Sequence, residues 1–112
     1  MSALDRRIPL LRWSHYGTIT YVVVISRKAL REFGRKYSDA RDPLAAWYKT
    51  VAGADWKNTA EVRETFKDVD FVGDKVVFNI AWNRYRLIAY ITYRVRTVYV
   101  KAILTHKEYD NG

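Results

Sequence analysis

The hydrophobic pattern of the chain becomes regular at residue 20. An unbroken run of β-branched and aromatic residues over 20–25 predicts a strand that is buried on both faces or nearly so. Ser26 follows as an N-cap residue, and apolar residues then recur at helical spacing. We expect this first helix to end near Tyr37. Its apolar positions are Leu30, Phe33 and Tyr37.

A second helix is predicted from local start and stop signals. Asp42 and Pro43 combine a capping residue with a proline at the first helical position, and Gly53 is placed to end the helix. Its apolar face is formed by Leu44, Trp47 and Val51.

A third, shorter helix follows. Residues 58–61, Asn-Thr-Ala-Glu, resemble a capping box, and the helix that they start should end near Phe66. Trp56 precedes this helix, and we expect it to anchor the loop by packing rather than to bind a ligand.

After a turn at Gly73 and Asp74 the pattern changes to a period of two. It predicts three strands over residues 75–82, 85–93 and 97–104, joined by a two-residue turn at Asn83 and Arg84 and a second short turn. The expected fold class is therefore α+β. An N-terminal strand and two to three helices would pack on one face of an antiparallel sheet that ends in a three-stranded meander.

Pairing Trp82 with Tyr85 across the first turn assigns the two faces of this sheet. The core face would carry Val76, Phe78, Ile80, Trp82, Leu87, Ala89 and Ile91. The outer face would carry Lys75, Asn79, Arg86, Tyr90 and Thr92, extended by Thr97, Tyr99 and Lys101 if the second loop has an even length. A basic and aromatic face suits RNA, but a solvated outer face has the same composition. A three-residue second loop would invert the last strand.

The C-terminal residues 105–110, Thr-His-Lys-Glu-Tyr-Asp, follow the last strand directly. Thr105 and Glu108 fit a capping box, although little chain remains to form a helix. His106 sits at the junction, and an imidazole suits proton transfer near neutral pH. Strict strand alternation would carry His106 to the core face. The chain must therefore bend at Thr105 if His106 is to join Arg86 and Asn79.

Residues 1–19 show no regular pattern. They are compatible with an added edge strand, a flexible basic arm, or a segment upstream of an alternative start site. We treat them as an N-terminal extension, and residues 20–112 as a single domain.

The charge of the chain indicates its partners more clearly than its size does. Twenty Lys and Arg residues against 12 Asp and Glu give a net charge of +8, which attracts nucleic acid. There is no cysteine, so disulfides and thiolate metal sites are excluded. Neither a signal peptide nor an apolar run long enough to span a bilayer is found, so we expect a cytoplasmic protein with no membrane partner.

Several short motifs, in this order, resemble the HigB-type toxins of the RelE/ParE superfamily, which belong to type II toxin–antitoxin systems. The resemblance covers residue 23 to the C-terminus. The motifs are Val24-Ile25-Ser26-Arg27-Lys28-Ala29-Leu30-Arg31-Glu32-Phe33, Trp47-Tyr48-Lys49, Ala54-Asp55-Trp56, Asp70-Phe71-Val72-Gly73, Val77-Phe78-Asn79-Ile80, Asn83-Arg84-Tyr85-Arg86-Leu87 and Thr105-His106-Lys107-Glu108-Tyr109-Asp110.

The resemblance implies a RelE/ParE-like fold and an endoribonuclease that cuts mRNA, usually on the translating ribosome, without metal or cofactor. It also implies a helix-turn-helix antitoxin of the HigA type, with which the toxin forms an oligomer. Cleavage by the ribose 2′-OH needs a base, an acid and cations at the phosphate. The expected catalytic residues are His106, Arg86, Lys107, Tyr109 and Asn79. The expected RNA-binding residues are Lys75, Tyr90, Tyr99 and Lys101.

Two other functions are open at this point. One is a non-nuclease toxin of the ParE type that inhibits a protein such as DNA gyrase, and the other is a non-catalytic RNA-binding module. The cluster of Arg86, His106 and Lys107 favours the nuclease, because a toxin that only blocks a protein does not require it. His15 lies outside the resemblance and is given no role.

Overall fold

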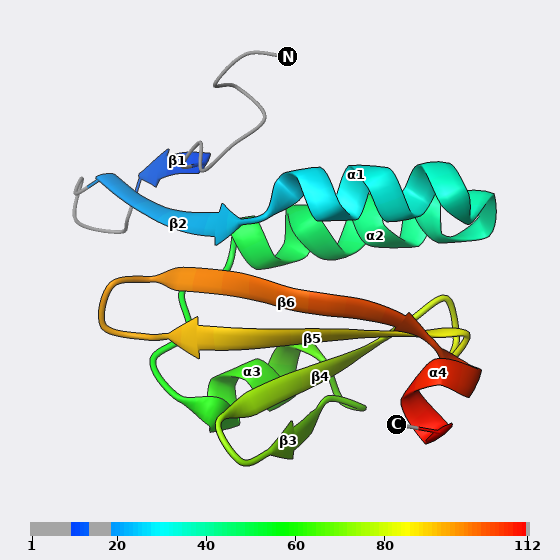
Figure 1. The fold of residues 1–112 in the computed structure, drawn as a ribbon. Helices are drawn as coiled ribbons and strands as arrows, with labels where there is room; N and C mark the ends of the chain where they lie inside the picture. Colours follow the sequence, from blue (N-terminus) through cyan, green and yellow to red (C-terminus); the bar gives the residue numbers. More distant parts are fainter. Residues whose placement is uncertain (1–9, 14–18, 112) are drawn as a thin grey trace.

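The structure, a computed structural model, describes residues 10–13 and 19–111. Its strands form a single six-stranded sheet in the order β1-β2-β6-β5-β4-β3 (Figure 1). The elements in chain order are β1 (Leu10–Trp13), β2 (Ile19–Ile25), α1 (Arg27–Lys36), α2 (Ser38–Ala52), α3 (Thr59–Thr65), β3 (Asp70–Val72), β4 (Lys75–Ile80), β5 (Tyr85–Thr92), β6 (Thr97–Thr105) and α4 (His106–Asn111). The α+β class is confirmed.

The sheet is mixed rather than antiparallel throughout, which corrects the prediction. β3, β4, β5 and β6 form an antiparallel meander, but β2 pairs with β6 in parallel, Val24 lying opposite Val98. The chain crosses from β2 to the meander through α1–α3, and this long connection permits a parallel neighbour.

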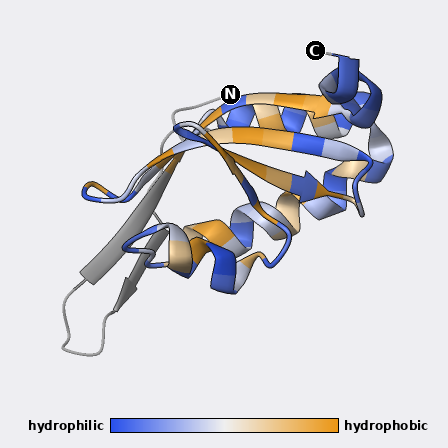
Figure 2. Ribbon diagram, turned by 90° about the horizontal axis from the view of Figure 1, so that it is seen from below, coloured by the Kyte–Doolittle hydropathy of each residue, from blue (hydrophilic) through white to orange (hydrophobic). Residues whose placement is uncertain are grey.

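Helices α1, α2 and α3 cover one face of the sheet, as predicted. Alternate residues of the strands point into the core, and the core residues of the helices pack against them. Hydrophobic and hydrophilic segments alternate along the strands in Figure 2, and α4 is predominantly hydrophilic. The sheet residues of the core cluster are Val24, Val76, Phe78, Ile80, Tyr85, Leu87, Ala89, Val98 and Val100.

The predicted start of the first helix is confirmed, because α1 begins at Arg27 directly after Ser26, but the start of α2 differs from the prediction. Ser26 has a left-handed backbone (φ 81°) and makes no side-chain cap, because an N-cap side chain needs an extended residue. α2 starts at Ser38 and holds Pro43 inside the helix, so the predicted start at Asp42 is wrong. Extending the helix buries Ala40 completely, which offsets the backbone hydrogen bond that proline cannot make.

The remaining helix signals are confirmed. α1 ends before Tyr37, and α2 ends at Gly53. The Asn58 side chain accepts a hydrogen bond from the Glu61 amide at 3.1 Å and so caps α3. Trp56 donates to Thr65 Oγ1 at 2.9 Å and packs against Phe66, as expected of a loop anchor. None of the described helices is long and apolar enough to cross a membrane.

The first turn of the meander is longer than predicted. Ile80, not Trp82, pairs with Tyr85, so the loop spans four residues, 81–84. Trp82 is 93% exposed, and its predicted place in the core is wrong. Each residue of β5 therefore pairs with a residue of β4 two positions earlier than predicted, and Asn79 lies directly opposite Arg86. Both side chains remain on the predicted outer face.

A β-bulge decides where His106 emerges. The loop of residues 93–96 has an even length, so Tyr99 faces outward as predicted. Ile88 then pairs with Ala102 and Ala89 with Val100, which leaves Lys101 as an extra residue. The bulge reverses the alternation, so that Leu104 lies opposite Arg86 on the outer face. The change of face occurs here, and the bend predicted at Thr105 is not needed.

The edges of the sheet add two strands. β3 forms a hairpin with β4 through the predicted turn at Gly73, whose φ is +62°, but β3 itself was not predicted. At the other edge β1 pairs with β2, which matches the edge-strand alternative for Leu10–Trp13. Residues 1–9 and 14–18, including His15, lie outside the described residues, so the division of the chain at residue 19 stays a prediction.

Candidate active site

Arg86 and His106 meet beside α4, where β5 begins and β6 ends; Figure 1 shows this corner of the sheet. Arg86 is the second residue of β5, and His106 is the first residue of α4. The guanidinium Nη2 is 3.2 Å from His106 Nδ1, and His106 Nε2 is 2.8 Å from Asp110 Oδ2. A neutral imidazole with its proton on Nε2 satisfies both contacts, because it accepts from Arg86 and donates to Asp110. The predicted meeting of Arg86 and His106 is confirmed.

Backbone contacts hold this histidine in place. Glu108 N–H donates to Thr105 Oγ1 at 3.1 Å, and Thr105 N–H donates to Glu108 Oε1 at 2.9 Å. His106 N–H donates to the Arg84 carbonyl at 2.8 Å. The Thr-His-Lys-Glu sequence is therefore a true capping box, and the same box mounts His106 rigidly beside the end of β6.

Tyr109 and a loop carbonyl flank the guanidinium of Arg86. The Arg86 Cζ atom lies 5.5 Å from the centroid of the Tyr109 ring, which is cation–π distance. Arg86 Nη1 also donates to the Asn83 carbonyl at 2.8 Å. These contacts orient a planar, permanently charged group on a half-exposed surface, where it is suited to phosphate oxygens.

Asn79 is adjacent to the cluster but does not bond to it. It faces Arg86 across the strands, and its amide nitrogen donates to the Asp68 side chain at 3.1 Å and to the Asp68 carbonyl at 3.2 Å. Lys107 is exposed on α4, and within the described residues no hydrogen bond or ion pair joins it to the cluster. Of the five predicted catalytic residues, three are thus in contact and one is a neighbour.

The predicted RNA-binding residues lie together on the outer face of the sheet. The Nζ atoms of Lys75 and Lys101 lie 5.9 and 5.7 Å from the centroid of the Tyr90 ring. Tyr99 pairs with Tyr90 across the strands and is 48% exposed. Lys101 reaches this face as the extra residue of the bulge. The result is a surface of two cations and two aromatic rings.

A carboxylate that the sequence did not assign to the site belongs to the cluster. Asp110 stands four residues after His106, one turn of helix, and that spacing was the available signal. Among the described residues no group of three or more histidine, aspartate or glutamate side chains could hold a metal ion. Asp110 instead orients the imidazole.

A second polar group ties the β4–β5 loop to the helices. Arg84 Nη1 donates to Asp39 Oδ2 at 2.7 Å, and the Tyr85 hydroxyl donates to Asp39 Oδ1. The hydrogen bond to Asp39, with burial, raises the pKa of Tyr85 to about 12. The bonds from Tyr85 and Arg84 lower the pKa of Asp39. This Asp39–Tyr85 contact fixes the start of β5 and hence the loop beside Arg86.

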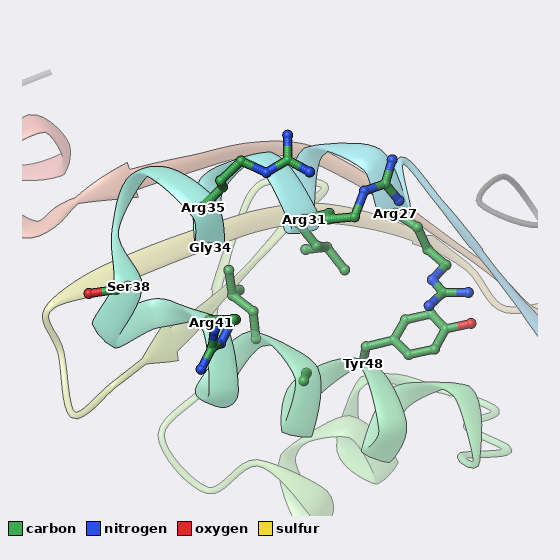
Figure 3. A pocket seen from close by; sticks show the side chains of 10 residues that line it. Arg27, Arg31, Gly34, Arg35, Ser38, Arg41 and Tyr48 are labelled. Atoms are coloured by element: carbon green, nitrogen blue, oxygen red, sulfur yellow. The ribbon is translucent and has the colours of Figure 1, made fainter. Parts of the chain in front are cut away.

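A separate hollow of about 540 Å³ lies between α1 and α2 (Figure 3). Its floor is apolar and its rim is basic, with the Arg27 guanidinium 4.3 Å from the centroid of the Tyr48 ring. The residues lining it are Arg27, Leu30, Arg31, Gly34, Arg35, Ser38, Arg41, Leu44, Ala45 and Tyr48. None of them is a predicted site residue, and none is a histidine or carboxylate.

Residues 40–112 match a family model described as HigB_toxin, the RelE-like toxic component of a toxin–antitoxin system. The chain is also similar to the "mRNA interferase toxin HigB" of Escherichia coli strain K12, with 29% identity over 90 residues that cover 78% of this chain and 86% of that protein. It is 30% identical over 90 residues to the "mRNA interferase HigB" of Escherichia coli O6:H1, covering 78% of this chain and 87% of that protein.

Proposed function

Because the chain belongs to the HigB family of RelE-like toxic components of toxin–antitoxin systems, we propose that it is an mRNA interferase, an endoribonuclease that cleaves mRNA. The name shared by its relatives supports this activity, and the mixed sheet with helices on one face is consistent with a RelE/ParE-like fold. The observation that carries the chemistry is the contact of Arg86 with His106, backed by Asp110.

The cleavage needs no metal, since the RNA supplies its own nucleophile. His106 takes the proton of the ribose 2′-OH, and the 2′ oxygen bonds to the adjacent phosphorus. The bond from phosphorus to the 5′ oxygen breaks, and that oxygen takes up a proton. The products are a 2′,3′-cyclic phosphate and a 5′-hydroxyl, so atoms and charge balance.

Arg86 stabilises the extra negative charge of the phosphorane in this scheme. Its guanidinium can donate to two phosphate oxygens, and doing so would release Nδ1 of His106 to face the 2′-OH. Lys107 adds a second positive charge nearby. Tyr109 lies against the guanidinium, from where its hydroxyl could donate to the phosphate or protonate the leaving oxygen. Asn79 orients the RNA backbone.

The basic and aromatic surface of β4, β5 and β6 is the proposed path of the RNA. Lys75 and Lys101 would neutralise phosphates, and Tyr90 and Tyr99 offer ring faces to unpaired bases. We further propose that the substrate is mRNA on the ribosome, in the cytoplasm, and that the toxin is held in an oligomer by a helix-turn-helix antitoxin of the HigA type. A toxin that only blocks DNA gyrase is not favoured, because it needs no oriented arginine–histidine pair.

The direct test is cleavage of mRNA by purified protein in a translation system with ribosomes. Wild type should cut, and His106→Ala should lose about 10²- to 10⁴-fold in rate, the range for a positioned acid or base. Arg94→Ala, in the exposed turn at the far end of the meander, is the matched control and should cut normally. Equal toxicity and cleavage by His106→Ala would refute the proposal.

A further inference from the structure

The loop beside the site has an unusual backbone. Ala81, Trp82 and Asn83 follow one another with φ of 54°, 54° and 84°. Asparagine tolerates this left-handed region, but alanine and tryptophan do not, since their Cβ atoms crowd the following carbonyl. Glycine is the usual solution at such positions. This loop instead holds a tryptophan, Trp82, in the strained left-handed conformation.

Burial does not compensate for this strain. Trp82 is 93% exposed, whereas Trp47 is 3% exposed in the core and Trp56 is packed against Phe66. An exposed indole gains little hydrophobic stabilisation, so Trp82 contributes nothing evident to the stability of the fold. Strained backbone that stability does not explain is concentrated at functional sites in proteins.

The position of the loop indicates what that function is. Asn83, the next residue, places its carbonyl on the Arg86 guanidinium, and the Arg84 carbonyl accepts the amide of His106. The backbone of Trp82 is thus joined through one residue to the group that would bind the scissile phosphate. The loop that carries Trp82 therefore borders any ligand held by Arg86 and His106.

We propose that Trp82 forms a nucleobase-binding subsite, on which a base next to the scissile phosphate stacks. The inference rests on the proposed ribonuclease function. An indole face accepts any base and adds affinity without base-specific hydrogen bonds. A neighbouring arginine that binds the phosphate gives the same nucleotide a second contact. An exposed tryptophan can also anchor a protein partner, but its place beside Arg86 and His106 favours RNA.

Three variants test this subsite. Trp82→Gly should cut mRNA about 5- to 150-fold more slowly, the range expected for loss of one base–aromatic stack. Its melting temperature should be unchanged or higher, because release of the left-handed strain offsets the freedom that glycine gives the unfolded chain. Trp82→Phe should keep most of the activity. Val95→Gly, which removes an exposed apolar side chain from the opposite turn, should behave as wild type.

The readouts separate this inference from the function on which it rests. Single-stranded RNA should quench the fluorescence of Trp82, obtained as the difference between wild type and Trp82→Phe. Quenching without cleavage by wild type would refute the ribonuclease and keep the subsite. Cleavage by wild type with full activity in Trp82→Gly would refute the subsite alone. A lower melting temperature of Trp82→Gly would also refute the subsite, because it would show that Trp82 stabilises the fold. So would an equal loss of cleavage rate in Trp82→Phe and Trp82→Gly. A Trp82→Gly variant that cuts normally but no longer binds the antitoxin would assign Trp82 to a protein partner instead.

Discussion

His106 uses both of its ring nitrogens, and the two contacts differ in kind. Nε2 faces the Asp110 carboxylate, which sits on the same short helix and moves with it. Nδ1 faces Arg86, which belongs to the sheet and is the group that a phosphate would engage. The carboxylate therefore orients the imidazole, while the arginine contact is one that substrate would replace.

Asp110→Ala should lower the cleavage rate by about 10- to 100-fold. The same range is found in metalloproteins when the hydrogen-bond partner that orients a metal-binding histidine is removed. The loss should be smaller than that of His106→Ala, because the capping box still holds the backbone. Single-turnover cleavage measures both. Asn111→Ala, at the next position of α4, is the control, and equal rates in Asp110→Ala and this control would contradict the role of Asp110.

The sequence predicts the site residues that lie on regular strands, because side chains there alternate between the two faces of the sheet. Arg86, Asn79, Tyr90 and Lys75 were assigned to the outer face because the strands around them are regular. The role of Asp110 was not predicted. A carboxylate one helical turn after a histidine can have several roles, and the structure distinguishes them by showing that the other ring nitrogen faces Arg86. Trp82 was misplaced because an apolar residue at the end of a strand normally continues the core pattern.

At the scale of elements, the bulge in β6 is what brings the last helix to the outer face. Val100 faces the core, Lys101 is extra, and Ala102 resumes the pairing with Ile88. This single unpaired residue brings His106 to the outer face, so that the predicted bend at Thr105 is not needed. Period-two reasoning cannot detect it, because lysine fits an exposed position whether or not the strand is regular.

The bulge makes an unusual deletion tolerable. Removing Lys101 leaves the pairs Ala89–Val100 and Ile88–Ala102 in place, so the protein should still fold. Its RNA affinity should fall by the same factor as that of the Lys101→Ala variant. Removing Val100 instead moves Lys101 to a buried position and should abolish folding. Circular dichroism and thermal melting compare the three variants. A Lys101 deletion that unfolds would contradict this account of the bulge.

Helix boundaries show the same limit. The capping residue Asn58 was predicted because its partner Glu61 lies three residues away. The start of α1 after Ser26 was also predicted, but the start of α2 at Ser38 was not, because packing against the sheet extends this helix past the local signal at Asp42 and Pro43. At Gly34 a Cβ atom would lie 3.1 Å from Arg41 Cα, which shows how closely α1 and α2 approach.

At the scale of the molecule, the α+β class and the face that carries the helices were predictable, because three regular strands and amphipathic helices have few ways to pack. The parallel pairing of β2 with β6 was not, since nothing local encodes a contact across more than 70 residues. The contact of Asp39 with Arg84 and Tyr85, 45 and 46 residues away, is also long-range. It joins the first turn of α2 to the loop beside the site.

This contact predicts how stability depends on pH. The raised pKa of Tyr85, about 12, means that its contribution is present below the usual value of 10 and is lost as the pH rises through 12. The lowered pKa of Asp39 means that its contribution is present above the usual value of 3.8 and is lost as the pH falls. Tyr85→Phe should therefore melt lower than wild type at pH 7, with a flatter decline above pH 10.

Differential scanning calorimetry across pH measures this, with Tyr99→Phe on the exposed face as the control. A Tyr85→Phe variant as stable as wild type at pH 7, or a decline above pH 10 identical to that of wild type, would show that the hydroxyl contributes nothing to the link between α2 and β5.

We propose that the Arg86–His106 pair directs the ribose 2′-OH against its own phosphate, and the chemical ends of the cut mRNA test this mechanism most directly. Wild type should leave 2′,3′-cyclic phosphate and 5′-hydroxyl ends, and a single 2′-deoxynucleotide at the mapped cut should block cleavage there. His106→Ala and Arg86→Ala should each remove these products. Ends with 5′-phosphate, or cleavage that survives the 2′-deoxy substitution, would contradict the account.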